Sequence, residues 1–216
     1  MRADVPKQYL PLFGRPMIAH ALERLCAPAR VRGVVVGLAA DDTYWQRISF
    51  DSEKFLGTFL GGETRAQTVL NGLQILASRA QPNDWVMVHD AARPCLRLED
   101  VERLIDRATQ HADGGLLALP VSDTVKRVDA SEKIVETVSR TDLWRALTPQ
   151  LFRFDKLTHA LREGLARGLS ITDEASAIEA DGGRPIVVPG HADNIKVTLP
   201  EDLALAEVIL RQQGAA

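Results

Sequence analysis

The sequence is poor in cysteine and has no long apolar run, and each shortage excludes a class of protein. Two cysteines, Cys26 and Cys95, in 216 residues are too few for the disulfide framework of a secreted domain or for a zinc knuckle. No apolar run approaches the roughly 18 residues that a membrane helix needs, and the first residues do not have the pattern of a signal peptide. We therefore expect a cytoplasmic protein in which both thiols are free and buried.

No charge of one sign dominates either. The 26 lysines and arginines and 29 acidic residues give a formal net charge of −3, which favours neither nucleic acid nor an anionic membrane as a partner. With 45% hydrophobic and 25% charged residues, the composition is that of a globular domain and excludes disorder or coiled coil as the main description. The length predicts a single domain over residues 1–216. Walker loops, metalloprotease helices and serine-hydrolase elbows are absent.

Strand-like and helix-like segments alternate along most of the chain. Continuous apolar runs, typical of strands buried on both faces, occupy residues 31–38, 85–89 and 115–119, and residues 185–188 and 194–198 have shorter strand-like patterns. Helical periodicity or helix-start signals mark residues 16–25, 64–80, 98–111, 155–167 and 200–213. We expect a capping box at the start of the last helix, with Thr198 as the cap and Glu201 as its partner. This alternation predicts a doubly wound α/β fold with a mostly parallel sheet.

One segment breaks the alternation. Two β-rich runs, residues 123–128 and 134–139, flank a polar turn and predict a hairpin. Both runs are charged and offer few core-forming side chains, so the hairpin would be marginal alone. We expect it to project from the domain and to pack on a second copy of the protein.

The segment His-Asp-Ala-Ala-Arg-Pro, residues 89–94, follows a predicted strand at the sheet edge where ligands bind in open α/β folds. Asp90 is suited to a magnesium ion, and Arg93 is suited to gripping a phosphate. The two alanines leave room for a ligand. A strand end capped by a surface ion pair would have the same sequence.

Other patterns have structural readings as well as functional ones. Residues 172–176 predict a helix start capped by Thr172. Asp193 and Lys196 fit either a solvated strand edge or a binding site, and Gly62 fits either a tight turn or a close approach to a ligand. Arg140, at the end of the hairpin, would ordinarily be a surface arginine.

Taken together, and in this order, the short segments resemble the 2-C-methyl-D-erythritol 4-phosphate cytidylyltransferase family. They are residues 6–10, 61–65, 89–94, 120–127, 137–150, 172–176 and 193–198. Each segment alone is moderately specific, but the ordered set spans nearly the whole chain. The resemblance implies a Rossmann-like nucleotidyltransferase fold in which residues 121–142 form a dimerisation arm.

The resemblance also implies a reaction. CTP and 2-C-methyl-D-erythritol 4-phosphate would give 4-diphosphocytidyl-2-C-methyl-D-erythritol and pyrophosphate, with Mg²⁺ as cofactor. The attacking phosphate is already a competent nucleophile, so no strong base is needed. Catalysis should come from alignment and from neutralisation of charge in the transition state.

Site roles follow from the same resemblance, position by position. The catalytic group is Lys7, Arg140 and Lys196, where Lys7 stabilises charge on the α-phosphate and the other two position the methylerythritol phosphate. Arg93, Thr124 and Thr148 are its further binding residues; Gly62, Glu63 and Thr68 recognise the cytidine; Asp90 and Asp193 accompany the metal. Thr124 and Arg140 would serve the site of the other subunit of a homodimer.

The sequence departs from the family pattern at its start. The family begins with a strand and a glycine-rich loop ahead of the position of Met1, so we expect the natural protein to be longer and this chain to be poorly active. Two other functions stay open: a cytidylyltransferase for another polyol phosphate such as ribitol 5-phosphate, and a non-catalytic nucleotide-binding or dimerisation protein.

Overall fold

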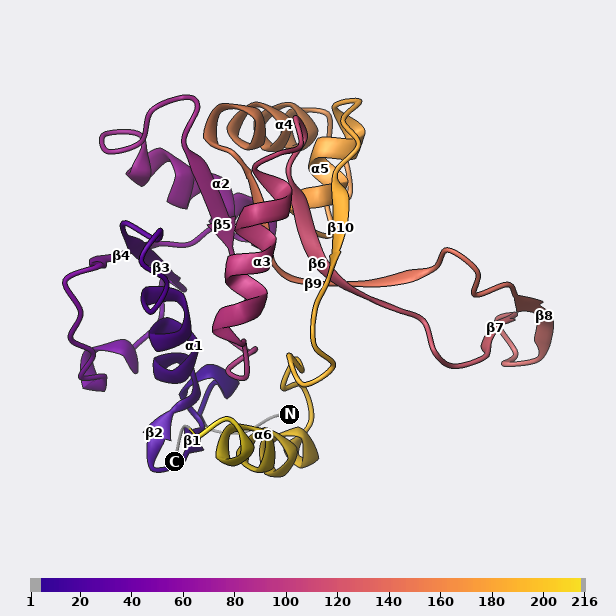
Figure 1. Ribbon diagram of the computed structural model, residues 1–216, viewed down its shortest axis with the longest axis horizontal. Helices are drawn as coiled ribbons and strands as arrows, with labels where there is room; N and C mark the ends of the chain where they lie inside the picture. Colours follow the sequence, from indigo (N-terminus) through magenta and orange to yellow (C-terminus); the bar gives the residue numbers. More distant parts are fainter. Residues whose placement is uncertain (1–4, 215–216) are drawn as a thin grey trace.

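The computed structural model describes residues 5–214 and shows a mixed α/β domain with one projecting arm (Figure 1). Its helices are α1 (Met17–Cys26), α2 (Arg65–Leu76), α3 (Leu98–Ala108), α4 (Phe154–Ala166), α5 (Glu174–Ala180) and α6 (Pro200–Gln212), with 3₁₀ turns η1 (Lys7–Tyr9) and η2 (Trp45–Arg47). Its strands are β1 (Pro11–Leu12), β2 (Arg15–Pro16), β3 (Val34–Leu38), β4 (Phe55–Leu60), β5 (Trp85–Val88), β6 (Gly115–Pro120), β7 (Val125–Val128), β8 (Ile134–Val138), β9 (Trp144–Arg153) and β10 (Ile186–Pro189). The expected helices and most expected strands are present.

The main sheet is mixed rather than mostly parallel. Its order is β10-β6-β9-β5, in which β10 runs parallel to β6 and β9 runs antiparallel to both β6 and β5. The arm is the cause: the chain leaves β6, makes the arm hairpin and returns directly beside β6, and such a return makes the neighbouring strand antiparallel. The expectation of a mostly parallel, doubly wound sheet was therefore wrong, although the α/β class is correct.

A second pair of strands lies apart from the main sheet. Strands β3 and β4 are parallel, in register from Val34 opposite Phe55 to Leu38 opposite Leu60. Within residues 5–214, β3 pairs with no strand except β4, and β5 pairs with no strand except β9. The sheet is thus interrupted between β3 and β5.

Helices cover both faces of the main sheet. On one face, α3 packs through Leu104 against Leu117 of β6 and Val188 of β10. On the other face, α2, α4 and α5 form a second apolar cluster around Phe152 and Leu161. Each fully buried side chain of this size contributes about 1.5–3 kcal/mol to folding, and the two layers hold the ends of β5 and β9 in place.

The hairpin β7–β8 projects far from the rest of the molecule (Figure 1). Its apolar side chains Val128, Ile134 and Val135 are 50%, 65% and 63% exposed. The projecting hairpin expected from the sequence is present, and nothing within the described chain covers its tip.

Four local expectations were wrong. Cys26 is only half-buried, whereas Cys95 is buried as expected. Residues 194–198 form no strand; instead the amide of Val197 donates to the carbonyl of Ala92, and the side chain of Asn194 donates to the carbonyl of Thr148 in β9. Asp173, not Thr172, caps α5, because its carboxylate accepts from the amide of Ser176. At α6, the carboxylate of Asp202 rather than Glu201 accepts from the amides of residues 198 and 199. No helix within the described residues is long and apolar enough to span a bilayer.

Candidate active site

A small polar pocket lies where β5 and β9 come together at the carboxyl end of β5. It has a volume of about 260 Å³, and its lining residues come from five separate parts of the chain. They are Arg65, Asp90, Arg93, Ala146, Leu147, Thr148, Gln150, Thr172, Asp173 and Lys196. We call this the β5 pocket. Among the described residues it gathers three cationic side chains around the half-buried carboxylate of Asp90, and Asp173 also lines it.

Asp90 is the centre of this cluster. Its carboxylate lies 2.9 Å from the Lys196 ammonium, 3.1 Å from Nε of Arg65 and 3.8 Å from Nε of Arg93. Burial would raise the pKa of Asp90, but the hydrogen bond from Lys196 and the charge of Arg65 outweigh it and hold the pKa below its ordinary value. Asp90 is therefore ionised at neutral pH, and it offsets part of the positive charge of Lys196, Arg65 and Arg93.

Arg65 is held from behind by a second carboxylate. Glu174, at the start of α5, is 1% exposed and accepts from both terminal nitrogens of Arg65 at 2.6 and 3.1 Å. Burial raises the pKa of Glu174, which Arg65 opposes. Because the Glu174 pair is bidentate, it fixes the orientation in which Arg65 also reaches Asp90.

His89 and Thr148 fix the backbone beneath the pocket. Nε2 of His89 lies 3.0 Å from the carbonyl of Arg93, which can only accept, so Nε2 carries the proton. Nδ1 then accepts from the hydroxyl of Thr148, which in turn accepts from the amide of Asp90. A neutral imidazole satisfies this chain of bonds, and burial lowers the pKa of His89 to about 4.

This arrangement predicts a pH dependence of stability. The pKa of His89 is lower in the folded protein than in the unfolded chain, so the unfolded state binds more protons between pH 6.5 and 4. The free energy of unfolding should fall as pH drops through this window, by up to about 1.4 kcal/mol per pH unit. Urea unfolding at pH 7 and pH 5 measures the difference. His89→Gln should reduce this difference in unfolding free energy, and the exposed control His159→Gln should not. An equal difference in all three proteins would contradict the role of His89 in the pH dependence.

Several expected site residues lie beside the β5 pocket rather than in it. Gly62 and Thr68 face each other at the turn between β4 and α2, where the Gly62 amide donates to the Thr68 hydroxyl at 2.9 Å. A Cβ on Gly62 would approach Gln67 to 2.2 Å, so the close turn requires glycine. Glu63 in the same turn is exposed, and Lys7 in η1 is half-buried.

The remaining expected residues lie elsewhere. Thr124 and Arg140 flank the arm hairpin, are exposed and line no part of the β5 pocket; Arg140 donates to the carbonyl of Ser122 at the base of the arm. Asp193 is bound at 2.7 Å by Arg97 and at 3.0 Å by Gln213. Within one chain, the structure therefore brings together Asp90, Arg93, Thr148 and Lys196 but not these three residues.

Two charged side chains at the pocket and one supporting side chain received no role from the sequence. Arg65 stood in a quoted motif but received no role, and Glu174 was read only as part of a helix start. Gln150, buried, donates to Asp173 at 2.9 Å and accepts from the amide of Ala175 at 2.8 Å, which attaches α5 to β9. Charged residues close to apolar segments were the signal in the sequence that could have pointed to Arg65 and Glu174. That signal does not show that the two side chains pair with each other.

Cations converging on one carboxylate at the carboxyl edge of an α/β sheet define a class of enzymes that act on phosphate-bearing substrates. Comparison with known proteins places the chain more closely within this class. The family model of IspD, 2-C-methyl-D-erythritol 4-phosphate cytidylyltransferase, matches residues 1–212. The chain therefore belongs to this family and is a nucleotidyltransferase of non-mevalonate isoprenoid biosynthesis, as the resemblance predicted.

Individual relatives agree. The 2-C-methyl-D-erythritol 4-phosphate cytidylyltransferase of Vibrio vulnificus (strain CMCP6) is 47% identical over 213 residues, which span 99% of this chain and 90% of that protein. The crystal structure of a 4-diphosphocytidyl-2C-methyl-D-erythritol synthase superposes with a TM-score of 0.86 at 39% identity, covering 95% of both chains. The Francisella tularensis enzyme gives 0.86 at 34% identity, covering 96% of this chain and 94% of that one.

Proposed function

We propose that the β5 pocket is where this chain transfers a cytidylyl group from CTP to 2-C-methyl-D-erythritol 4-phosphate. A phosphate oxygen of the acceptor would attack the α-phosphorus of CTP, the bond from that phosphorus to the bridging oxygen of the β-phosphate would break, and pyrophosphate would leave. The convergence of Arg65, Arg93 and Lys196 on Asp90 is the observation that supports this most directly.

The chemistry of the reaction fits a pocket built from cations. Two polyanions must approach each other, and additional negative charge develops on the α-phosphoryl oxygens. Preorganised cations in a partly dry pocket neutralise this charge without reorganisation at the moment of reaction. Lys196 is the most adaptable of the three, since its single ammonium group can move from Asp90 to a phosphate oxygen. No side chain in the pocket needs to remove a proton.

The donor set of the pocket fits a magnesium ion that the substrate phosphates hold in part. Among the described residues no cluster of three His, Cys, Asp or Glu side chains exists that could hold a metal alone. Mg²⁺ commonly uses one or two carboxylates and completes its shell with water and phosphate oxygens. Asp90 is the protein ligand that this pocket would offer, and bound Mg²⁺ would supply further charge neutralisation at the triphosphate.

The turn between β4 and α2 would hold the nucleoside. The glycine at position 62 leaves its backbone accessible, and Thr68 fixes the turn from α2. Lys7 reaches the same side of the molecule, because it and Thr68 both line a larger cavity that also contains Asp90. Lys7 would then neutralise charge on the α-phosphate.

The projecting arm would complete the site of a second subunit. Thr124 directly precedes β7 and Arg140 follows β8, and neither lines the β5 pocket of its own chain. The exposed apolar tip formed by Val128, Ile134 and Val135 would pack on the partner. A homodimer built this way would place one arginine from each chain near the acceptor phosphate of the other.

Pyrophosphate release from CTP, Mg²⁺ and 2-C-methyl-D-erythritol 4-phosphate tests the function. Lys196→Ala should lower kcat/KM by about 100-fold, while the control Lys156→Ala, an exposed lysine of α4 that does not line the β5 pocket, should match the unaltered chain. A higher kcat/KM with ribitol 5-phosphate would show that the acceptor is another polyol phosphate. Nucleotide binding without turnover for either acceptor would overturn the proposal.

If the arm binds only the acceptor, changes in it should affect use of the methylerythritol phosphate but not binding of CTP. Arg140→Ala should lower kcat/KM for the methylerythritol phosphate by about 100-fold and leave CTP affinity nearly unchanged. The control is Arg127→Ala, another exposed arm arginine, which pairs with Glu136 within its own hairpin. Mixing Arg140→Ala with Lys7→Ala subunits should restore part of the activity, because some sites in the mixed dimer contain neither change. No recovery after proven subunit exchange would contradict a shared site.

A further inference from the structure

Lys196 lies on a segment without regular structure, which we call the 190–199 loop. Residues 190–199 connect β10 to α6 and form neither helix nor strand, yet Asn194 is only 1% exposed and Val197 is fully buried. Connections of this kind normally lie on the surface, because buried backbone groups need hydrogen-bond partners. The position of the Lys196 ammonium therefore depends on the few groups that attach this loop to the domain.

Asn194 attaches the 190–199 loop to two walls of the β5 pocket. Its Nδ2 donates to the carbonyl of Thr148 in β9 at 2.8 Å, and both groups are buried. Its own carbonyl accepts from Nη1 of Arg93 at 2.7 Å, again in a buried contact. Thr148 and Arg93 line the pocket, whereas Asn194 does not. Asn194 thus lies behind the pocket and contacts two of its residues.

The bond to Asn194 also sets the orientation of the Arg93 guanidinium. Nε of Arg93 is buried and has no hydrogen-bond partner within residues 5–214. It lies 3.8 Å from the carboxylate of Asp90, which is too far for a hydrogen bond. The guanidinium is therefore oriented by its bond to a backbone carbonyl, and the side chain of the same asparagine holds that carbonyl in place.

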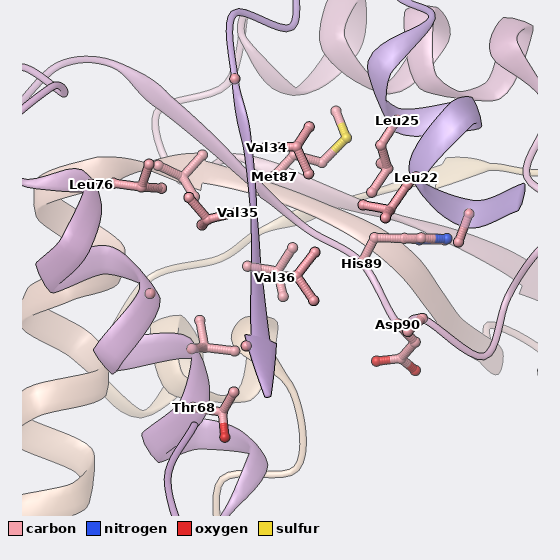
Figure 2. A pocket seen from close by; sticks show the side chains of 18 of the residues that line it. Leu22, Leu25, Val34, Val35, Val36, Thr68, Leu76, Met87, His89 and Asp90 are labelled. Atoms are coloured by element: carbon pink, nitrogen blue, oxygen red, sulfur yellow. The ribbon is translucent and has the colours of Figure 1, made fainter. Parts of the chain in front are cut away.

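Lys196 lies between two attachments of the loop. Asn194 provides the first, and the amide of Val197 provides the second by donating to the carbonyl of Ala92 at 2.8 Å. Between them the Lys196 ammonium reaches Asp90 at 2.9 Å. Figure 2 shows the carboxylate of Asp90 at one end of the larger cavity. Without the first attachment, the loop would be free to move on the side that carries the contact with Arg93.

We propose that Asn194 is a positioning residue for the transfer reaction: its side chain holds the Arg93 guanidinium and the Lys196 ammonium in the arrangement that receives the phosphate of the acceptor. This inference rests on the proposed function, since the roles of the two cations toward the acceptor belong to it. Asn194 itself contacts no reacting group. Two cations on different segments can act on one phosphate only while their separation is fixed, and a small displacement lowers the rate steeply.

Asn194→Leu tests the role, because leucine has a similar size and cannot donate to the carbonyl of Thr148. We expect kcat/KM for 2-C-methyl-D-erythritol 4-phosphate to fall by about 100-fold, mainly through a higher KM, with the KM for CTP changed by less than about twofold. The control is Leu104→Ala in α3, which removes a fully buried side chain that lines neither cavity. It should keep both KM values. Circular dichroism checks folding, and Asn194→Ala replaces Asn194→Leu if the latter does not fold.

Chemical labelling of lysine measures the same displacement without turnover. Lys196 and Lys156 form a matched pair, since their side chains are 42% and 46% exposed and each ammonium lies 2.9 Å from an aspartate. The reagent is an amine-directed succinimidyl ester, and mass spectrometry follows each site. In Asn194→Leu the labelling rate of Lys196 relative to Lys156 should rise about fivefold. In Leu104→Ala this ratio should stay as in the unaltered chain.

The two measurements separate this inference from the proposed function. If the unaltered chain releases no pyrophosphate with this acceptor, the proposed function fails, and the labelling ratio alone decides whether Asn194 places Lys196. An unchanged ratio in folded Asn194→Leu would overturn the inference, and so would an equal rise of the KM values for both substrates. A rise of the same size in Leu104→Ala would assign the effect to general loss of stability and overturn it as well.

Discussion

Replacing Arg65 with methionine should destabilise the protein by about 3–5 kcal/mol. The guanidinium is the partner through which the buried carboxylate of Glu174 is neutralised, and it also contacts Asp90. Without it, a carboxylate that is 1% exposed would remain uncompensated. Urea unfolding measures the loss directly, and the melting temperature should fall by about 10 °C.

Two matched variants separate this effect from a general loss of arginine. Arg30→Met removes an exposed pair with Glu102, whose side chains are 44% and 36% exposed, and should cost less than about 1 kcal/mol. The double variant Arg65→Met with Glu174→Leu should recover most of the stability, since it removes both buried charges together. It should not recover turnover, because the β5 pocket would still lack a cation.

The pH dependence gives the loss a specific signature. In Arg65→Met the pKa of Glu174 should rise further, because burial acts on it without opposition. The folded state would then bind a proton more readily than the unfolded state, so the destabilisation should be smaller at pH 5 than at pH 8. A loss of stability that is the same at both pH values, with no recovery in the double variant, would contradict a role in neutralising Glu174.

Much of the fold could be predicted from the sequence because most elements carry strong local patterns. The apolar runs of β5 and β6 and the periodicity of α1–α4 are properties of single segments. Strand β9 is different. Its residues include Thr148, Pro149 and Gln150, which do not look like a buried strand, and they are buried because β5 and β6 pair on both sides. Its direction depends on the arm, so the mixed sheet could not be derived from runs alone.

In the candidate site, too, some residues could be predicted from local motifs and others depend on contacts between distant segments. Asp90 and Arg93 could be picked out because their motif suggested metal and phosphate chemistry, whereas Thr148 and Lys196 received their roles from the family resemblance. The structure places all four together. The pair of Arg65 and Glu174 joins positions 109 residues apart and depends on how α5 docks on α2 and β9. No local pattern encodes that contact. In the proposed homodimer Thr124 and Arg140 would act in the site of a second chain, and no pattern within one chain encodes that contact.

The two aspartates expected at the metal should behave very differently. Asp90→Asn should lower kcat/KM by about 10³-fold and raise the Mg²⁺ concentration needed for half-maximal rate, because its carboxylate faces the β5 pocket. Asp193→Asn should change neither by more than a few-fold. Arg97 and Gln213 occupy one carboxylate oxygen of Asp193, and the structure gives it no contact with the pocket.

Binding of Mn²⁺ in the presence of CTP, followed by electron paramagnetic resonance, measures the same contrast without turnover. Asp90→Asn should weaken formation of the ternary complex by about 10–100-fold, and Asp193→Asn should leave it intact. Unfolding in urea provides the opposite comparison. Asp193→Asn should lower the free energy of unfolding, because it weakens the ion pair with Arg97. Weakened Mn²⁺ binding in Asp193→Asn, at unchanged stability, would show that Asp193 turns from Arg97 toward the metal when the nucleotide binds.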